Sequence, residues 1–333
     1  MGLERPPMVI QECRDAEAYL RQRRLQSRKQ LHSGERDDAD PLVFTADGGA
    51  VPVGKLERKR TADGPRTEVR KLRKGTRSIA GRESRFIAVH KAEGNGDRVV
   101  DCHIAPYDTP AFTGDRMFAA AVEAGLGDTS QIHGVFDMGK WIHTQFEQQF
   151  FAYAHTACAD IMHVAEYLVD AGRVLVGDDN AFGWAMEHKR RLLAGEFDHV
   201  LAKLSAHQCA DSCRKGDHGK CLVQVAHGYL ENNAKYMKGY ADLMIRELPV
   251  GSGEAESGIR HVIKRRMAIA GAWTEENAAL LLGLLAIRAS GWWDDFWQWR
   301  HRRDKVAWRH RQENHHKVLF RNKRRQQPRR AAA

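Results

Sequence analysis

The sequence has few cysteines and no long apolar run, and each absence excludes a class of protein. Six cysteines among 333 residues, unevenly spaced, are too few for the disulfide framework of a secreted domain. No apolar stretch approaches the roughly 18–20 residues that a membrane-spanning helix needs, and the charged N-terminus does not resemble a secretory signal. With 42% hydrophobic and 29% charged residues, the chain is not disordered throughout. We therefore expect a cytoplasmic protein of one large domain or two smaller ones.

Positive charge is in excess, and it is concentrated in two segments. Residues 301–333 contain 12 basic and 2 acidic residues, which accounts for the whole net charge of +10. Residues 55–85 contain 12 basic and 4 acidic residues. Such clusters indicate a polyanionic partner, most simply DNA, with Arg324 and Arg325 among the expected phosphate contacts. A solubilising tail and a charged surface loop are the alternative.

The apolar pattern predicts an α/β fold in five parts. Strands are expected at 41–47, 50–58, 85–92, 98–105 and 131–136, with a turn at Gly48-Gly49 and a helix at 115–124. Three meandering strands, a helix and a further strand resemble the opening of a ribonuclease H-like fold. The expected parts are an N-terminal helical segment (1–40), a first core part (41–144), a helical insertion (145–248), a last core part (249–300) and a basic, unstructured tail (301–333).

Two acidic residues follow predicted strands, and a third begins a predicted helix. Asp47 and Asp137 each come directly after a short apolar run, so their carboxylates converge if the strands are neighbours. Phosphodiester chemistry uses two hard cations about 4 Å apart, held by carboxylate oxygens from distant parts of the chain. Glu256 lies in the first turn of a basic helix and shares a helical face with Arg260. The alternative for Glu256 is an acid that stabilises the helix dipole.

Several motifs, in order along the chain, resemble the DDE transposases of the Kra type of bacterial insertion sequences. The C-terminal block is LPVGSGEAESGIRHVIKRRM followed by GAWTEENAALLLGLLAIRASGWWDDFW. TADGG (45–49) looks like the family's first catalytic Asp-Gly, and FDMGKWI (136–142) looks like its Asp-Gly-Ala-x-Trp-Ile. ADIMHVAEYL (159–168) and YLENNAKYMKGYADL (229–243) resemble its Asp-x-x-His helix start and the segment before the Gly-Ser-Gly turn. The resemblance covers roughly residues 41–299.

The resemblance implies a ribonuclease H-like catalytic domain with a mostly α-helical insertion before the last catalytic carboxylate. It implies metal-dependent cleavage at insertion-sequence ends and transfer of the freed 3′ hydroxyl into target DNA, with two Mg²⁺ (or Mn²⁺) ions. The expected partners are transposon ends and target DNA, bound by a homodimer or larger synaptic assembly in the bacterial nucleoid, with no membrane. By analogy, Asp47, Asp137 and Glu256 are catalytic and metal-binding; Asp160, His163 and Trp141 support them; and Arg260, Lys264, Arg265 and Arg266 hold the DNA backbone.

Two departures from the family pattern support an alternative function. Met138 stands where the family has a glycine after its second aspartate, and only 46 residues precede Asp47, fewer than the family's usual N-terminal region. The alternative is a decayed or truncated copy that acts only as a DNA-binding protein.

A cysteine-bearing loop between two predicted helices has the residue types of a zinc site. Cys209, Cys213, His218 and Cys221 are candidate ligands, with His207 as a further one. Their spacing differs from the common C-x-x-C pairs. The alternative is a hydrophilic loop whose thiols bind no metal.

Overall fold

A computed structural model describes residues 7–32, 41–54, 79–92, 98–104, 110–210, 213–216, 219–268 and 273–326. Most of the basic segment 55–85 lies outside these residues, and so do the side chains of Arg324 and Arg325 and the whole of His218. Within the described part of the chain, no helix is both long and apolar enough to cross a membrane.

The core is a mixed sheet of five strands in the order β3-β2-β1-β4-β5. β2 is antiparallel to β1 and to β3, whereas β4 is parallel to β1 and to β5. The strands are β1 (Leu42–Gly54), β2 (Ile79–Lys91), β3 (Val99–Ile104), β4 (Gln131–Phe136) and β5 (Ala154–Ala159). An antiparallel meander of three strands, extended by two parallel strands beside the first, is the ribonuclease H-like topology that the sequence predicted. The fold class is therefore α/β, as expected.

The predicted turn at Gly48-Gly49 is wrong, because β1 is one continuous strand of 13 residues. β2 is long enough to pair with all of it, from Leu42 opposite Lys91 to Gly54 opposite Ile79. Pairing with Arg85 and Ser84 of β2 holds both glycines in extended conformation, so the chain makes no turn there. Asp47 consequently lies in the middle of β1, at the point where the neighbouring β4 ends.

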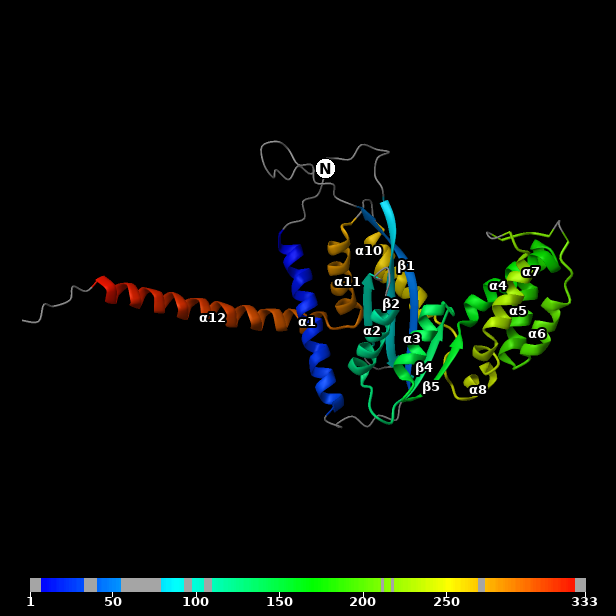
Figure 1. Cartoon of the computed structure of the whole chain (residues 1–333), viewed down its shortest axis with the longest axis horizontal. Coiled ribbons are helices and arrows are strands. Elements are labelled where there is room, and N and C mark those ends of the chain that lie inside the picture. The colour runs from blue at the N-terminus through cyan, green and yellow to red at the C-terminus, as the bar shows by residue number, and fades with distance from the viewer. Residues whose placement is uncertain are drawn as a thin grey trace, which may run out of the picture.

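Helices cover both faces of the sheet, since its strands alternate apolar residues between two cores (Figure 1). In β1, Phe44 and Ala46 face the main core, whereas Val51 and Val53 face the smaller one. The covering helices are α2 (Pro110–Ala124) and α3 (Lys140–Phe150) over the main core, and α9 (Gly253–Gly258), η2 (Ile259–Lys264), α10 (Arg265–Met267) and α11 (Glu275–Ala289) over the smaller one. The residues expected to form one basic helix are thus α9, the π-helical η2 and α10.

The helical insertion begins later than predicted, because residues 154–159 form the edge strand β5. The sequence AHTACA has no alternation of apolar and polar residues, so the strand is recognisable only through its pairing with β4. After β5 the chain forms a separate helical lobe (Figure 1). Its elements are α4 (Ile161–Leu175), α5 (Asp178–Leu193), α6 (Phe197–Ser205), α7 (Leu222–Asn232), η1 (Ala234–Tyr236) and α8 (Tyr240–Ile245).

The N-terminal helix α1 (Pro7–His32) is part of the core rather than an independent segment. Ala16, Tyr19 and Leu20 are buried in the main core, and α1 packs beside α11. Asp15 accepts a hydrogen bond from Arg303 at 2.7 Å, which ties α1 to the first turns of α12. The sequence pattern showed no core for α1 because its few apolar residues are separated by many charges.

The C-terminal segment is helical where disorder was expected. Helix α12 (Trp293–Gln326) starts against α1 and then extends away from the body (Figure 1). Among its described side chains, Val306 and Trp308 are 50% and 57% exposed. Many of its residues are Arg, Lys, Gln and Glu, which have good helix propensity, so continuation from a packed first turn explains the helix.

Candidate active site

Asp47 and Asp137 lie side by side on neighbouring strands. β1 and β4 run parallel, and their last paired residues are Ala46 and Phe136, so an aspartate directly follows each of them. Neighbouring strands are about 4.7–4.9 Å apart. Side chains alternate along a strand, which places Asp47 on the same face of β1 as Gly49 and Val51, the face covered by α9 and η2.

Each of these carboxylates is held by one backbone amide. Gly48 donates to Asp47 Oδ1 at 2.6 Å, and Gly139 donates to Asp137 Oδ1 at 2.9 Å. Within the described residues, the second oxygen of each carboxylate makes no hydrogen bond. Two adjacent carboxylates with one free oxygen each are the donor set that a hard divalent cation takes in proteins. The residues present therefore fit a Mg²⁺ or Mn²⁺ site.

The electrostatic environment of Asp47 is that of a partly buried, like-charged pair. Burial raises the pKa of Asp47, and the neighbouring carboxylate of Asp137 raises it further. The amide of Gly48, the ammonium of Lys264 and the ring of His163 act in the opposite direction. A bound cation relieves the repulsion that two ionised aspartates would otherwise keep.

Met138 has the backbone conformation that glycine favours. Its φ is +63°, in the left-handed region where a side chain costs roughly 1–2 kcal/mol. The side chain is buried (7% exposed) and packs into the main core. The turn after Asp137 thus keeps the shape that a glycine there would adopt.

A cluster of aromatic side chains lies beside Asp137, and its two tyrosines, Tyr167 and Tyr229, were not among the residues expected from the sequence. The hydroxyl of Tyr229, on α7, donates to the carbonyl oxygen of Asp137 at 3.0 Å. Tyr167, on α4, stacks on Tyr229 with ring centroids 4.0 Å apart, and His163 meets both rings edge-on. Burial, followed by the charge of Asp137, raises the pKa of Tyr167. His163 and Tyr167 are four residues apart on one helical face, a signal that the sequence did contain.

Glu256 lies on the helix that packs over the strand of Asp47. Ile259, one turn further along, fills the space above Gly49, and Gly258 packs directly on the ring of Phe86 in β2. Glu256 and Ile259 are three apart, so they share a side of the helix. The side chain of Glu256 is exposed and makes no ion pair or hydrogen bond within the described residues.

The other acid at the start of α9 has a structural role. Glu254 pairs with Arg98 at 3.0 Å and with His90 at 3.1 Å. Burial, the largest single cause, raises the pKa of Glu254, but the contacts with His90 and Arg98 together outweigh it, so the pKa is lowered. Of the two glutamates, only Glu256 is therefore available to a ligand.

Asp160 and His163, both expected to support the catalytic acids, have different partners. Asp160 is the N-cap of α4: its Oδ1 accepts from the amide of Met162 at 2.7 Å, and its Oδ2 accepts from the hydroxyl of Ser252. His163 instead pairs with Glu166 at 3.3 Å. Asp160 thus joins the Gly-Ser-Gly turn to the insertion, and His163 is the member of the pair that lies near the carboxylates.

Trp141 packs close to the turn after Asp137, and its described partner is in the sheet. The guanidinium of Arg85, on β2, lies 3.7 Å from the centre of the Trp141 ring. Arg85 also donates to the hydroxyl of Thr113 on α2. This contact joins the turn after Asp137 to β2.

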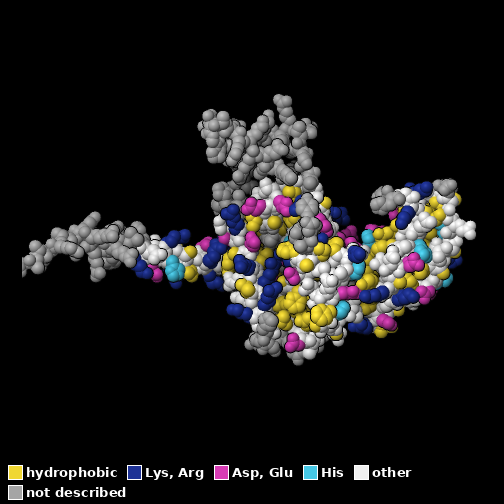
Figure 2. Space-filling view, viewed as in Figure 1, with side chains coloured by type: hydrophobic (Ala, Val, Ile, Leu, Met, Phe, Trp, Pro, Cys, Tyr) yellow, Lys and Arg dark blue, Asp and Glu magenta, His cyan; other side chains and the backbone are white. Residues whose placement is uncertain are grey.

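A row of basic side chains continues from the site along η2 and α10. Arg260, Lys264, Arg265 and Arg266 are all exposed, and none makes an ion pair with a residue that the structure describes. Lys264 lies near Gly49 and is close enough to Asp47 to lower its pKa. Figure 2 shows further Lys and Arg side chains over α1 and along α12.

Comparison with known proteins gives little for this chain. No protein-family model matches it, and no curated protein matches it. Among solved structures, it is similar to the Drosophila P element transposase strand transfer complex, with 9% identity, covering 81% of this chain and 68% of that chain. The TM-score is 0.28, which is too low to support a fold or a function. The fold assignment rests on the order and direction of the strands.

Proposed function

We propose that this chain is a DDE-type transposase that cleaves DNA at insertion-sequence ends and joins the 3′ hydroxyl to target DNA. The observation that carries the proposal is the placement of Asp47 and Asp137 on adjacent parallel strands, after the pair Ala46 and Phe136. The resemblance of the C-terminal motifs to Kra-type transposases agrees with it.

In this proposal, Asp47 and Asp137 bind the metal ions through the oxygens that the backbone amides leave free. Glu256 completes the set of carboxylates from α9. When bound, two Mg²⁺ ions supply activation of the attacking oxygen and stabilisation of the leaving one. The packing of Ile259 over Gly49 sets the distance between α9 and the strand of Asp47.

The basic row on η2 and α10 provides the DNA contact. Arg260, Lys264, Arg265 and Arg266 neutralise backbone phosphates and so orient a strand across the carboxylates. His163, on α4 of the insertion, is near enough to Asp47 to affect its pKa, and it contacts the same DNA strand. Because two ends must be held together, the active form is a homodimer or larger assembly.

The deciding experiment compares Glu256 with its neighbour Glu254. The purified protein and its Glu256→Gln, Asp137→Asn and Glu254→Gln variants are incubated with labelled DNA from the flanks of its own gene, in Mg²⁺ and then in Mn²⁺. We expect cuts at a repeat boundary with the wild type and with Glu254→Gln, and at least about a thousandfold loss with the other two. Full cleavage by Asp137→Asn would refute the assignment of the site.

A DNA-binding protein without catalysis is the second candidate, motivated by the residue at position 138. This candidate predicts salt-sensitive DNA binding, no cuts in either metal, and no Mg²⁺- or Mn²⁺-dependent rise in Tm that Asp47→Ala abolishes. Restoring the family glycine with Met138→Gly would then test whether that one departure accounts for the lost chemistry.

A further inference from the structure

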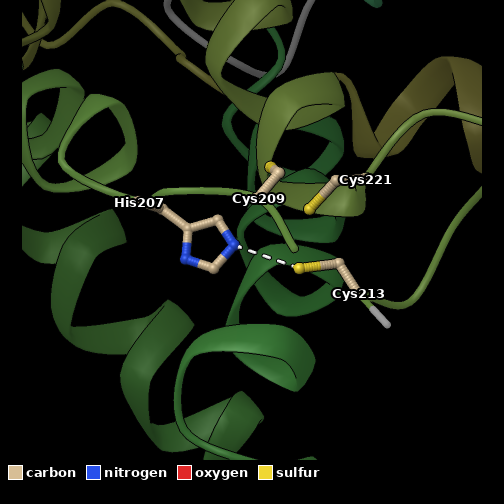
Figure 3. A group of neighbouring side chains, drawn as sticks. All are labelled: His207, Cys209, Cys213 and Cys221. Atoms are coloured by element: carbon tan, nitrogen blue, oxygen red, sulfur yellow. Dashed lines mark hydrogen bonds between the residues drawn. The ribbon is translucent and has the colours of Figure 1, made fainter. Parts of the chain in front are cut away.

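A long loop in the insertion brings four soft ligand atoms together, far from the carboxylates in the chain. α6 ends at Ser205 and α7 begins at Leu222, and the residues between them form no helix or extended strand in the part that the structure describes. Loops of this length are uncommon in compact domains unless something organises them. His207, Cys209, Cys213 and Cys221 converge in this loop, and their ligand atoms all lie within 4.8 Å of one another (Figure 3).

The spacing of these atoms fits a tetrahedral ion. Zinc bonds of about 2.3 Å to sulfur and about 2.0 Å to nitrogen, at tetrahedral angles, hold two sulfurs about 3.8 Å apart and a nitrogen and a sulfur about 3.5 Å apart. The distance from His207 Nε2 to Cys213 Sγ is 3.5 Å. The sulfur of Cys221 points toward the space between them, and the sulfur of Cys209 lies within 4.8 Å of the other three ligand atoms (Figure 3).

The backbone of the loop supports the ligands in the way that structural zinc sites require. The amide of Ala210 donates to Cys213 Sγ at 3.3 Å, a contact that favours the thiolate. A small hairpin places Cys221 opposite Lys215, with Gly216 N donating to Lys220 O at 2.9 Å. Cys221 directly precedes α7, where the helix N-terminus also favours a negative sulfur.

The three cysteines outside the loop lie apart from one another, on different elements of the fold. Cys13, Cys102 and Cys158 are each buried in packed parts of the fold, on α1, β3 and β5. The loop cysteines range from exposed Cys209 to buried Cys221, so an ion here is reachable from solvent and anchored in the core.

We propose that His207 Nε2 and the thiolates of Cys209, Cys213 and Cys221 bind a structural Zn²⁺ ion. The sequence offered His218 as a candidate ligand and His207 as a further one; His218 lies outside the described residues, and the ligand atom of His207 lies within 4.8 Å of all three thiols. Three thiols release their protons to solvent as the ion binds, and the imidazole stays neutral. The ion closes the tetrahedron, so it leaves no position for a substrate.

The site joins α6 to α7 and sets the shape of the loop between them. Arg214, next to Cys213, reaches Asp178 on α5 at 2.7 Å, so the loop connects three helices of the insertion. Tyr229, which contacts Asp137, lies two turns along α7 from Cys221. Zinc therefore stabilises the lobe that borders the carboxylates, and the proposal does not depend on the DNA chemistry proposed above.

Metal analysis of the full chain tests the site. The protein is purified without chelators from cells supplied with zinc, and metal per chain is measured by mass spectrometry. We expect about one zinc ion per chain, and Co²⁺ exchange should give the visible absorption of a tetrahedral cobalt thiolate. Cys209→Ser and His207→Ala should each weaken zinc affinity at least about tenfold in competition with a chromophoric chelator.

Two controls separate this site from other sources of zinc. His199, an exposed histidine on α6, is the matched control for His207, and His199→Ala should retain zinc. The double variant Asp47→Asn, Asp137→Asn should also retain it, which excludes binding by the carboxylates. Cys209 is exposed, so Cys209→Ser tests the site even where Cys221→Ser fails to fold. Less than about a tenth of an ion per chain, zinc unchanged in Cys209→Ser, or a disulfide between two of the three cysteines would each overturn the proposal.

Discussion

The hydroxyl of Ser252 donates to the carboxylate of Asp160, 92 positions earlier in the chain. Ser252 belongs to the turn before α9, and Asp160 is the N-cap of α4. A second bond, from the amide of Ile161 to the carbonyl of Val250 at 2.9 Å, joins the same two segments. The start of the insertion and the start of the helix that carries Glu256 are therefore fixed to each other.

Removing the serine hydroxyl should destabilise the protein. Asp160 and Ser252 are 7% and 6% exposed, so Ser252→Ala leaves one carboxylate oxygen poorly hydrated. We expect a loss of about 1–3 kcal/mol, measured as a lower urea midpoint. Ser205 is the control, because its exposed hydroxyl bonds only to carbonyls of its own helix, and Ser205→Ala should change little. An unchanged midpoint in Ser252→Ala would show that the bond is absent in solution.

Position 138 should prefer glycine to alanine, the reverse of most buried positions. Met138→Ala loses the buried side chain and keeps the strained φ, whereas Met138→Gly loses the side chain but relieves the strain. Both variants should be less stable than the wild type. In urea unfolding, Met138→Gly should have a free energy of unfolding about 1 kcal/mol higher than Met138→Ala. Met117, buried in α2, is the matched control. There the alanine variant should be more stable than the glycine variant by about 1 kcal/mol. The same order at both positions would contradict the left-handed φ.

The close approach of α9 to the sheet should make Gly258 intolerant of any side chain. A Cβ at Gly258 would lie 2.2 Å from the ring of Phe86, which is fully buried. We expect Gly258→Ala to cost about 1–3 kcal/mol and to be partly rescued by Phe86→Leu, as a double-mutant cycle would measure. Gly228 on α7 has open space around it, so Gly228→Ala should be neutral or stabilising by up to about 1 kcal/mol. Equal effects at the two glycines would refute the close contact.

The stability of the metal-free protein should depend on the ionisation of Asp47. Burial is the main cause that raises the pKa of Asp47; the amide of Gly48 opposes it, and the charge of Asp137 adds to it. The folded state therefore binds the proton more tightly than the unfolded state does. The stability that comes from this tighter proton binding is therefore present at low pH. It is lost as the pH rises from the ordinary aspartate pKa through the raised pKa of Asp47.

Asp47→Asn removes that pH-dependent cost. In chelator at pH 7, the variant should melt about 2 °C above the wild type, and the gap should close as the pH falls below the pKa of Asp47. Added Mg²⁺ or Mn²⁺ should raise the Tm of the wild type only. A variant that melts below the wild type at pH 7 would contradict the repulsion between Asp47 and Asp137.

Much of this fold is specified by signals a few residues long. The strand predicted at 131–136 is β4, and the helix predicted at 115–124 lies within α2. The hydroxyl of Thr274 accepts from the amide of Asn277 at 3.2 Å, a local bond that the residue type itself favours. These features depend on interactions between residues close together in the chain, which can be recognised from the sequence alone.

Tertiary structure decided the features that depend on partners distant in the chain. Gly48 and Gly49 are in a strand because β2 pairs along all of β1, and Gly49 is required because Ile259 packs on it. Residues 154–159 are a strand only because β4 offers an edge. Tyr229 reaches Asp137, and His207 meets the three loop thiols, because the insertion folds back on itself. The sequence by itself determined which residue types are available for chemistry, and the packing of distant segments determined which of them meet.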